Sequence, residues 1–262
     1  MMRALSIAAT GMLAQQMNVD VIANNLANMT TTAYKRQRAE FQDLLYQNIS
    51  RVGTASSDTG TILPTGIQLG LGVKPGAIYR VGDQGTLLQT GNQFDVAING
   101  KGFMQVTLPS GEIAYTRDGS FQVNQNGEIV NPQGYVVAPG ITVPQDAVSV
   151  DINASGQVSV KQDGNVTPTV VGQFEMANFV NEAGMQAIGN NMFQETEASG
   201  TPISGFGGGT GFGTIQQKFL EQANVDSISE VTSLITAQRS YELNSRVISS
   251  SDEMLQTLNQ LR

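Results

Sequence analysis

The stretch 224–255 reads NVDSISEVTSLITAQRSYELNSRVISSSDEML, and its apolar spacing decides how this end of the chain folds. Apolar residues recur at spacings of three, seven, seven and seven, at Val231, Leu234, Tyr241, Ile248 and Leu255. Polar residues fill the other positions of this seam, at Gln238, Ser245 and Asp252. The pattern predicts a coiled-coil-like helix. Asp226 or Ser227 is a suitable N-cap, and no Gly or Pro follows Ala223. We therefore expect a helix over about 224–262, on the order of 57 Å long.

The first 28 residues show a similar pattern. Apolar residues recur every seven positions, with two more at the intervening offset, at Leu5, Met12, Val19 and Leu26 and at Ala8 and Ile22. Gln15 also lies in this seam and weakens it. Capping and β-branched residues gather from Asn28 to Thr32, where we expect the helix to end. The pattern runs through any cleavage point that a signal peptide would need, so we expect no cleaved leader.

Between these ends the periodicity changes from that of a helix to two. Alternating apolar residues are separated by Asn-Gly and Asp-Gly pairs at 99–100, 118–119, 126–127 and 163–164. Such pairs between alternating runs are typical of β-hairpins. The middle of the chain, from about Ala77 to Glu197, is therefore predicted to be an antiparallel β domain.

Two connectors flank this β domain. Residues 53–72 are rich in Ser, Thr and Gly, and residues 204–214 contain a glycine-rich run. Both are predicted to be mobile or irregular. The fold class is α+β, with two terminal helices that form a coiled-coil-like α domain and a central antiparallel β domain. The predicted boundaries are 1–35 for the N-terminal helix, 36–76 for an extended linker or insertion, 77–203 for the β domain, 204–222 for the return linker and 223–262 for the C-terminal helix.

Composition excludes several classes of function. The chain has 262 residues without Cys or His, which removes thiol chemistry, disulfides and imidazole ligands. The net charge is −8, and residues 118–217 carry it, with nine acids against one base. We see no basic patch for nucleic acid and no apolar run of the roughly 20 residues that cross a bilayer. Charged residues make up only 14 % of the chain, and the resulting neutral surface suits contacts between proteins.

Two motifs invite a functional reading and do not support one. The glycine-rich run 205–213 lacks the Lys followed by Ser or Thr of a phosphate loop. The run from Asp151 to Gly156 resembles half of a calcium loop, but Gln162 stands where a bidentate Glu is required. We therefore expect no catalytic site, no metal and no cofactor.

The two seams have an alternative reading, in which the helices pack on the β domain as part of one core. Both stripes are narrow and keep a period of 3.5, whereas a helix lying on a sheet usually has a wider apolar face. We favour helices that pack on other helices, so the interface candidates are Leu5, Met12, Val19, Ile22, Leu26, Val231, Leu234, Tyr241, Ile248 and Leu255. A charge at Leu234 or Ile248 is expected to block assembly.

Several motifs resemble the flagellar rod and hook family, in order and along nearly the whole chain. They are Asn24-Asn-Leu-Ala-Asn28 with Tyr34-Lys-Arg36, the run Phe94–Phe103, the run Tyr115–Phe121 continuing to Tyr135, and Asn224-Val-Asp226 with Gln238-Arg-Ser-Tyr241. Ala223 departs from the family's usual Ser, and Thr30-Thr-Thr32 departs from its usual turn. Length and the segment 48–71 are most similar to the distal rod members.

The resemblance implies a subunit of a rigid hollow helical polymer, the drive shaft of the flagellum, located from the periplasm to the outer membrane. It implies self-assembly, proximal rod and hook proteins at the two ends, P-ring and L-ring proteins around the rod, and export through the flagellar type III apparatus. It also implies that the inserted segment stiffens the rod, with Ser57, Leu63, Pro64 and Ile67 as candidates. No partner role is expected for nucleic acid, and no membrane insertion.

Two other functions stay open at this point. One is a hook or proximal rod subunit of the same family. The other is a carbohydrate- or surface-binding β domain with oligomerising tails, although sugar sites rely on exposed aromatic residues, and this chain has no Trp and only 6 % aromatic residues.

Overall fold

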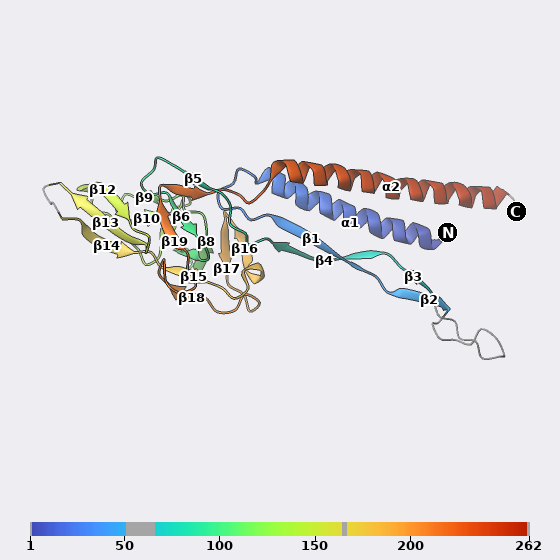
Figure 1. Ribbon diagram of the computed structural model, residues 1–262, viewed down its shortest axis with the longest axis horizontal. Helices are drawn as coiled ribbons and strands as arrows, with labels where there is room; N and C mark the ends of the chain where they lie inside the picture. The colour runs from blue at the N-terminus through green and yellow to red at the C-terminus, as the bar shows by residue number, and fades with distance from the viewer. Residues whose placement is uncertain (1, 51–65, 164–166, 261–262) are drawn as a thin grey trace. The chain divides into compact units, whose positions relative to one another are not determined.

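The computed structural model describes residues 2–50, 66–163 and 167–260 and has the predicted α+β class, with a helix at each end of the chain (Figure 1). It divides into two compact units. The helical unit consists of Met1–Ala27, Gln37–Tyr79 and Asp226–Arg262. The β unit consists of Asn28–Arg36 and Arg80–Val225.

Two long helices dominate the helical unit, α1 (Met2–Ala27) and α2 (Ser227–Gln260). They lie side by side and antiparallel (Figure 1). Asp226 caps α2, since its Oδ1 accepts a hydrogen bond from Ile228 N at 3.1 Å. Both helices were predicted from periodicity. The ends of α2 differ from the prediction by only a few residues, but the boundary of 1–35 for the N-terminal helix is wrong, because α1 ends at Ala27 and residues 28–36 belong to the β unit.

The rest of the helical unit is a pair of strand ribbons. β1 (Gln37–Asp43) pairs with β4 (Val73–Arg80), and β2 (Tyr46–Ser50) pairs antiparallel with β3 (Ile67–Gly70). The prediction of an irregular connector over 53–72 is therefore wrong for 67–70. The alternation Ile67-Gln-Leu69 is short but has the period of a strand. Residues 53–65 of that predicted connector lie outside the described residues.

The β unit contains one large sheet with the order β16-β17-β8-β7-β11-β10-β9, in which β15 also pairs with β7 and with β18. A second sheet has the order β12-β13-β14, and two strand pairs, β6–β19 and β5–β20, complete the unit. The bounds are β5 (Leu87–Gln89), β6 (Val96–Asn99), β7 (Phe103–Thr107), β8 (Ile113–Thr116), β9 (Gln122–Val123), β10 (Ile129–Val130), β11 (Val136–Val137), β12 (Ala147–Ile152), β13 (Gln157–Gln162), β14 (Thr169–Gln173), β15 (Met176–Asn178), η1 (Glu182–Gly184), β16 (Gln186–Gly189), β17 (Met192–Gln194), β18 (Ile203–Gly205), β19 (Thr214–Gln217) and β20 (Phe219–Glu221).

The main core of the β unit lies where these sheets face one another. Its fully buried members include Phe121, Phe174, Ile98 and Met176. Phe121 and Phe174 stack with their ring centroids 6.0 Å apart. A satellite cluster packs edge to face around Phe103, Tyr115 and Phe179.

The predicted hairpin turns divide into two groups. Asn126-Gly127 joins the antiparallel pair β9–β10, as expected. Asn99-Gly100 and Asp118-Gly119 do not join hairpins, because β6 pairs with β19, and β8 pairs with β7 and β17. The glycines serve close packing instead. A Cβ on Gly119 would lie 1.6 Å from the Val96 carbonyl oxygen, and one on Gly100 would lie 2.9 Å from Gly213 Cα.

The predicted return linker 204–222 is also mostly ordered pairing. It contains β19 and β20, and Ile215 of β19 is buried in the main core. The glycine-rich run lacks strands from 206 to 213. Gly205, the last residue of β18, packs on this run, since a Cβ there would lie 2.4 Å from the Phe212 ring. The glycines mark close contacts with a neighbouring ring, which composition alone cannot separate from flexibility.

Candidate assembly surfaces and a buried polar junction

The interface between α1 and α2 buries one side of α2. The buried or half-buried positions follow spacings of four and three, at Glu230, Leu234, Ala237, Asn244, Ile248, Ser251 and Leu255. Leu234, Ile248 and Leu255 were predicted for this seam. Tyr241 shares their spacing but is 43 % exposed, and it lines a groove with Val19 of α1. Val231 is 40 % exposed and lies beside this face.

The polar half of the α2 seam was predicted wrongly. Gln238, Ser245 and Asp252 are all exposed. Their places are taken by Glu230, Ala237, Asn244 and Ser251. Both sets are polar or small, so hydropathy does not distinguish them. The three exposed residues each lie one position after a buried or half-buried one, at Ala237, Asn244 and Ser251.

The buried face of α1 is wider than predicted. Ile22 is buried, and Leu5, Met12, Val19 and Leu26 are half-buried. Ala14 and Val21 are also buried, because α1 contacts the strand ribbon as well as α2. At this second contact Thr10 Oγ1 accepts a hydrogen bond from Val73 N at 3.4 Å.

Two contacts fix how α1 and α2 align. A Cβ on Gly11 would lie 2.9 Å from Asn244 Nδ2, so the helices approach closely there. Near the other end, Asn25 Nδ2 donates to Glu230 Oε2 at 3.3 Å. Asn25 also binds both backbone groups of Gln37, its N–H at 2.8 Å and its carbonyl at 2.9 Å. Asn25 belongs to the Asn-rich motif of the first helix, and its side chain therefore joins α1, α2 and the start of β1.

Two apolar surfaces in the helical unit stay exposed. One is a stripe on α2, which we call the α2 stripe, made of Ile228, Val231, Ile235, Leu243, Val247 and Met254. The other is on the β2–β3 ribbon and its flanks, made of Leu45, Tyr46, Ile49, Ile67, Leu69 and Leu71. Leu45 is 84 % exposed and Ile228 78 %. Apolar side chains gathered in this way mark interaction surfaces.

The predicted stiffening residues are only partly described. Ile67 begins β3 and is exposed on the apolar ribbon. Ser57, Leu63 and Pro64 lie outside the described residues.

A buried polar junction lies in the β unit, around Glu221 at the end of β20. The side chain of Glu221 is 0 % exposed, and its Oε1 lies 2.6 Å from Lys35 Nζ and 3.7 Å from Arg117 Nη1. Gly85 N donates to the same oxygen at 2.9 Å. Arg117 also donates to the carbonyl oxygens of Gly100 and Gly102. Buried charges of this kind are tolerated when they are paired and hydrogen-bonded.

The environment shifts the pKa of Lys35. Burial lowers it and the nearby Arg117 guanidinium lowers it further, while Glu221 partly offsets both effects. Lys35 Nζ also donates to the Asp83 carbonyl at 2.8 Å. The ammonium group thus exchanges its hydration for two oxygen partners.

Asn224 completes this junction. Its Oδ1 accepts from Arg36 N at 2.6 Å, and its Nδ2 donates to the carbonyl oxygens of Val81 and Asp83 at 3.0 and 2.9 Å. Lys35 and Arg36 come from the N-terminal motif and Asn224 from the C-terminal one. Arg36 and Asn224 are 188 residues apart in the chain, and the β unit brings their motifs together.

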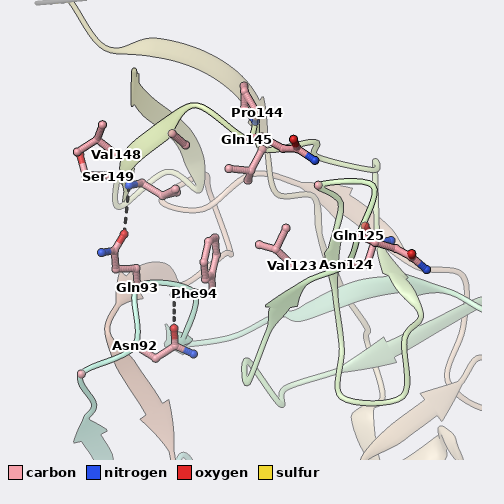
Figure 2. A pocket seen from close by; sticks show the side chains of 15 residues that line it. Asn92, Gln93, Phe94, Val123, Asn124, Gln125, Pro144, Gln145, Val148 and Ser149 are labelled. Atoms are coloured by element: carbon pink, nitrogen blue, oxygen red, sulfur yellow. Dashed lines mark hydrogen bonds between the residues drawn. The ribbon is translucent and has the colours of Figure 1, made fainter. Parts of the chain in front are cut away.

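A shallow pocket of about 600 Å³ lies elsewhere on the β unit, between the loop 91–94 and strands β9 and β12 (Figure 2). Its lining carries amide side chains and Phe94 but no ionisable group. Gln93 closes one side, since its Oε1 accepts from Val150 N at 3.3 Å. Gln217 binds the same strand edge, accepting from Ile152 N at 3.1 Å and donating to the Val150 carbonyl at 2.7 Å. A neutral pocket of this composition offers no acid or base that could activate the Ser149 hydroxyl in its lining.

Among the described residues, no cluster of three or more acidic side chains is arranged to hold a metal ion. No described helix has the length and apolar character needed to cross a membrane.

Comparison with known proteins identifies flagellar sequence families along the chain. The flagellar hook protein FlgE/F/G D1 domain matches residues 97–160, the flagellar basal body rod FlgEFG protein C-terminal family matches 216–261, and the flagella basal body rod protein family matches 5–35. The hook protein FlgE2 of Helicobacter pylori covers 71 % of this chain and 43 % of its own at 15 % identity, with a TM-score of 0.25. That score is too low for any structural argument.

Full-length relatives are more informative. The flagellar basal-body rod protein FlgG of Caulobacter vibrioides is 56 % identical, with 100 % of both chains covered. FlgG of Buchnera aphidicola subsp. Acyrthosiphon pisum is 48 % identical and FlgG of Bacillus subtilis 35 % identical, again with 100 % of both chains covered. The chain therefore belongs to the flagellar rod and hook family, in its FlgG group of structural basal-body rod proteins.

Proposed function

We propose that this chain is a subunit of the distal rod that polymerises into a rigid hollow helical shaft and transmits motor torque to the hook. The observation that carries the proposal is the α2 stripe together with the apolar β2–β3 ribbon. A subunit that leaves this much apolar surface exposed is stabilised when copies of itself cover that surface, because burying apolar groups lowers the free energy. The shared name of the full-length relatives favours a rod subunit over a hook subunit.

We assign the two helices, α1 (2–27) and α2 (227–260), to an inner α layer with coiled-coil-like packing. The α1–α2 contacts support this assignment, because buried positions on α2 alternate by three and four residues. The β unit, residues 28–36 and 80–225, would form the outer layer. The acidity of residues 118–217 would then keep the outer surfaces of neighbouring subunits hydrated.

The proposed partners follow from this position in the flagellum. They are other copies of the chain, proximal rod and hook proteins at the two ends, P-ring and L-ring proteins around the shaft, and the flagellar type III export apparatus. Export of an unfolded chain without a cleaved leader would suit a sequence with no disulfide to form. The proposed location runs from the periplasm to the outer membrane. We assign no enzymatic role.

Assembly would also complete the folding of the helices. A helix pair with exposed apolar stripes and many hydroxyl residues is marginal without partners. In α2, Thr232, Thr236 and Ser240 each donate to the backbone carbonyl four residues earlier, which weakens a helix slightly. We therefore expect helical content to rise when free subunits polymerise.

Electron microscopy of the purified protein tests the proposal. Straight tubes of uniform diameter with a central channel are expected. Circular dichroism of the free subunit should show less helix than the tubes contain. A protein that stays monomeric at high concentration, with both helices already complete, would contradict the proposal.

A further inference from the structure

We infer that the segment 31–36, just after α1, belongs to the β unit as a docked segment and stays bound to it in the unassembled subunit, held by the Lys35–Glu221 ion pair. Any folding of the helices on assembly would then begin at Ala27 and at Asp226. This inference rests on the proposed function only for that last consequence. The docking itself is a property of the β unit.

The backbone of the docked segment is bound along its length. Ala33 N donates to the Glu221 carbonyl at 2.8 Å. The Arg36 carbonyl accepts from Val81 N at 2.8 Å, and Arg36 N donates to Asn224 Oδ1 at 2.6 Å. The segment therefore lies between residues 81–83 and 221–224, and both neighbours belong to the β unit.

Side chains add to this backbone pairing. Asn191 Nδ2 donates to the Thr32 carbonyl at 3.1 Å. Ala33 is buried and adopts a positive φ of 57°, which an Ala tolerates only where surrounding contacts compensate for the strain. The segment is thus packed as well as hydrogen-bonded.

The ion pair makes release of this segment costly. Removing Lys35 from the junction would leave Glu221, whose side chain is 0 % exposed, with Arg117 at 3.7 Å as its nearest cation. A buried carboxylate that loses its closest cation is strongly destabilised. The segment can therefore leave only if the surrounding β unit opens and hydrates Glu221.

Docking has a consequence for the two helices. The segment 31–36 follows the end of α1, and residues 221–224 precede the N-cap of α2. Because these two segments are hydrogen-bonded to each other, the tethers of both helices are held at one place even when the helices are unfolded. A short separation between tethers raises the effective concentration of the two helix segments for each other.

Hydrogen exchange of the full-length free subunit, read by mass spectrometry at single-residue resolution, tests the inference. The amides of Ala33 and Arg36 are expected to be protected as strongly as that of Val96, which donates to the Gly119 carbonyl at 3.0 Å within the β unit, a hydrogen bond that does not involve the docked segment. If they exchange at the rate of an unstructured peptide, the inference is wrong. Protection of 2–27 and 227–260 in the free subunit is a separate result, which would contradict assembly-coupled folding and leave the docking intact.

Substitutions then test the ion pair. Lys35→Met keeps most of the side-chain length and removes the charge, and we expect exchange at Ala33 and Arg36 to accelerate about a hundredfold. Lys161→Met removes one charge from an exposed position of β13 and should leave both amides unchanged. Equal protection in Lys35→Met and the wild type would overturn the role of the pair.

A second variant covers the case in which Lys35→Met does not fold. Glu221→Gln keeps the shape of the side chain and removes the negative charge, so Lys35 loses its anion while Gln can still accept from Gly85 N. Faster exchange at Ala33 is expected here too. Unchanged exchange would show that backbone pairing alone holds the segment.

Discussion

Glycine positions in the β unit reveal how tightly individual strands approach one another. Gly119 and Gly91 are both glycines without a positive φ, but their surroundings differ. A Cβ at Gly119 would lie 1.6 Å from the Val96 carbonyl oxygen, whereas a Cβ at Gly91 would meet nothing within 4 Å. A Gly→Ala change therefore tests close packing at Gly119. At Gly91 it tests the conformational entropy of the unfolded chain.

We expect Gly119→Ala to lower the free energy of unfolding of the β unit by about 3 kcal/mol, because backbone cannot move aside as a side-chain end can. Gly91→Ala should change it by less than about 1 kcal/mol and in the stabilising direction. Denaturant unfolding monitored by tyrosine fluorescence measures both. Similar stabilities for the two variants would show that β6 does not approach Gly119 in solution.

Tyr115 gives a prediction for alkaline pH. Burial raises the pKa of its phenol, and the Glu195 carboxylate raises it further. Above a pH of about 10, the unfolded chain ionises Tyr115 while the folded protein keeps it neutral, so stability falls as pH rises. Below that pH, Tyr115 is neutral in both the folded and the unfolded state, so its ionisation does not change the stability of the protein.

The matching experiment compares the wild type with Tyr115→Phe by denaturant unfolding at two values of pH, one neutral and one above the ordinary tyrosine pKa. The wild type should lose more stability than the variant between them. Identical losses would mean that the hydroxyl of Tyr115 is hydrated in the folded state.

At the scale of elements, the α2 stripe is the surface on which assembly is expected to depend. Leu243→Asp places a charge in the middle of this stripe, and we expect it to abolish tube formation because burying an unpaired carboxylate is costly. Sedimentation and electron microscopy measure assembly. Thermal unfolding of the β unit should be unchanged.

Ser249→Asp is the control for that variant, since it adds the same charge at an exposed polar position of α2. If both variants block assembly equally, the charge of the helix matters and the apolar stripe does not. Ile248→Asp answers a different question, because Ile248 is half-buried on the face toward α1. It should loosen the helix pair as well as prevent assembly.

Local patterns predicted the elements better than their partners. The spacing of Leu234, Ile248 and Leu255 by multiples of seven residues was enough to place α2, because the backbone hydrogen bonds of a helix all lie within one segment of the chain. Asn126-Gly127 was likewise enough for the β9–β10 hairpin. The pairing of β6 with β19 joins distant segments, and no turn residue encodes it.

The polar junction was beyond sequence reasoning for a related reason. Lys35 and Glu221 are ordinary charged residues in the printed sequence, and only the fold shows that both are buried. Lys35 lies in the Tyr34-Lys-Arg36 motif that resembles the family, whereas Glu221 lies outside every such motif. Their partnership depends on three chain segments meeting in the β unit.

At the scale of the whole molecule, the segment 53–66 is predicted to control stiffness of the polymer. Shortening it should yield tubes that bend more, because the resemblance to distal rod proteins implies that this segment stiffens the tube. Curvature distributions in electron micrographs measure this. Straight tubes from the shortened variant would contradict a stiffening role.

A length-matched control separates length from composition. Replacing residues 53–66 with Gly and Ser in equal number keeps the connection and removes Leu63 and Pro64. Stiff tubes from this variant would assign the effect to length, and flexible tubes would assign it to these side chains.

The glutamines that bind the free edge of β12 affect how β units of neighbouring subunits can contact one another. Gln93 and Gln217 occupy the N–H groups of Val150 and Ile152 that would otherwise be available to a strand from another molecule. When β units are held at high density around a shaft, an open edge would invite neighbouring sheets to fuse into one continuous sheet. Here the amide groups have already filled those positions, so neighbouring β units can slide past this edge without joining.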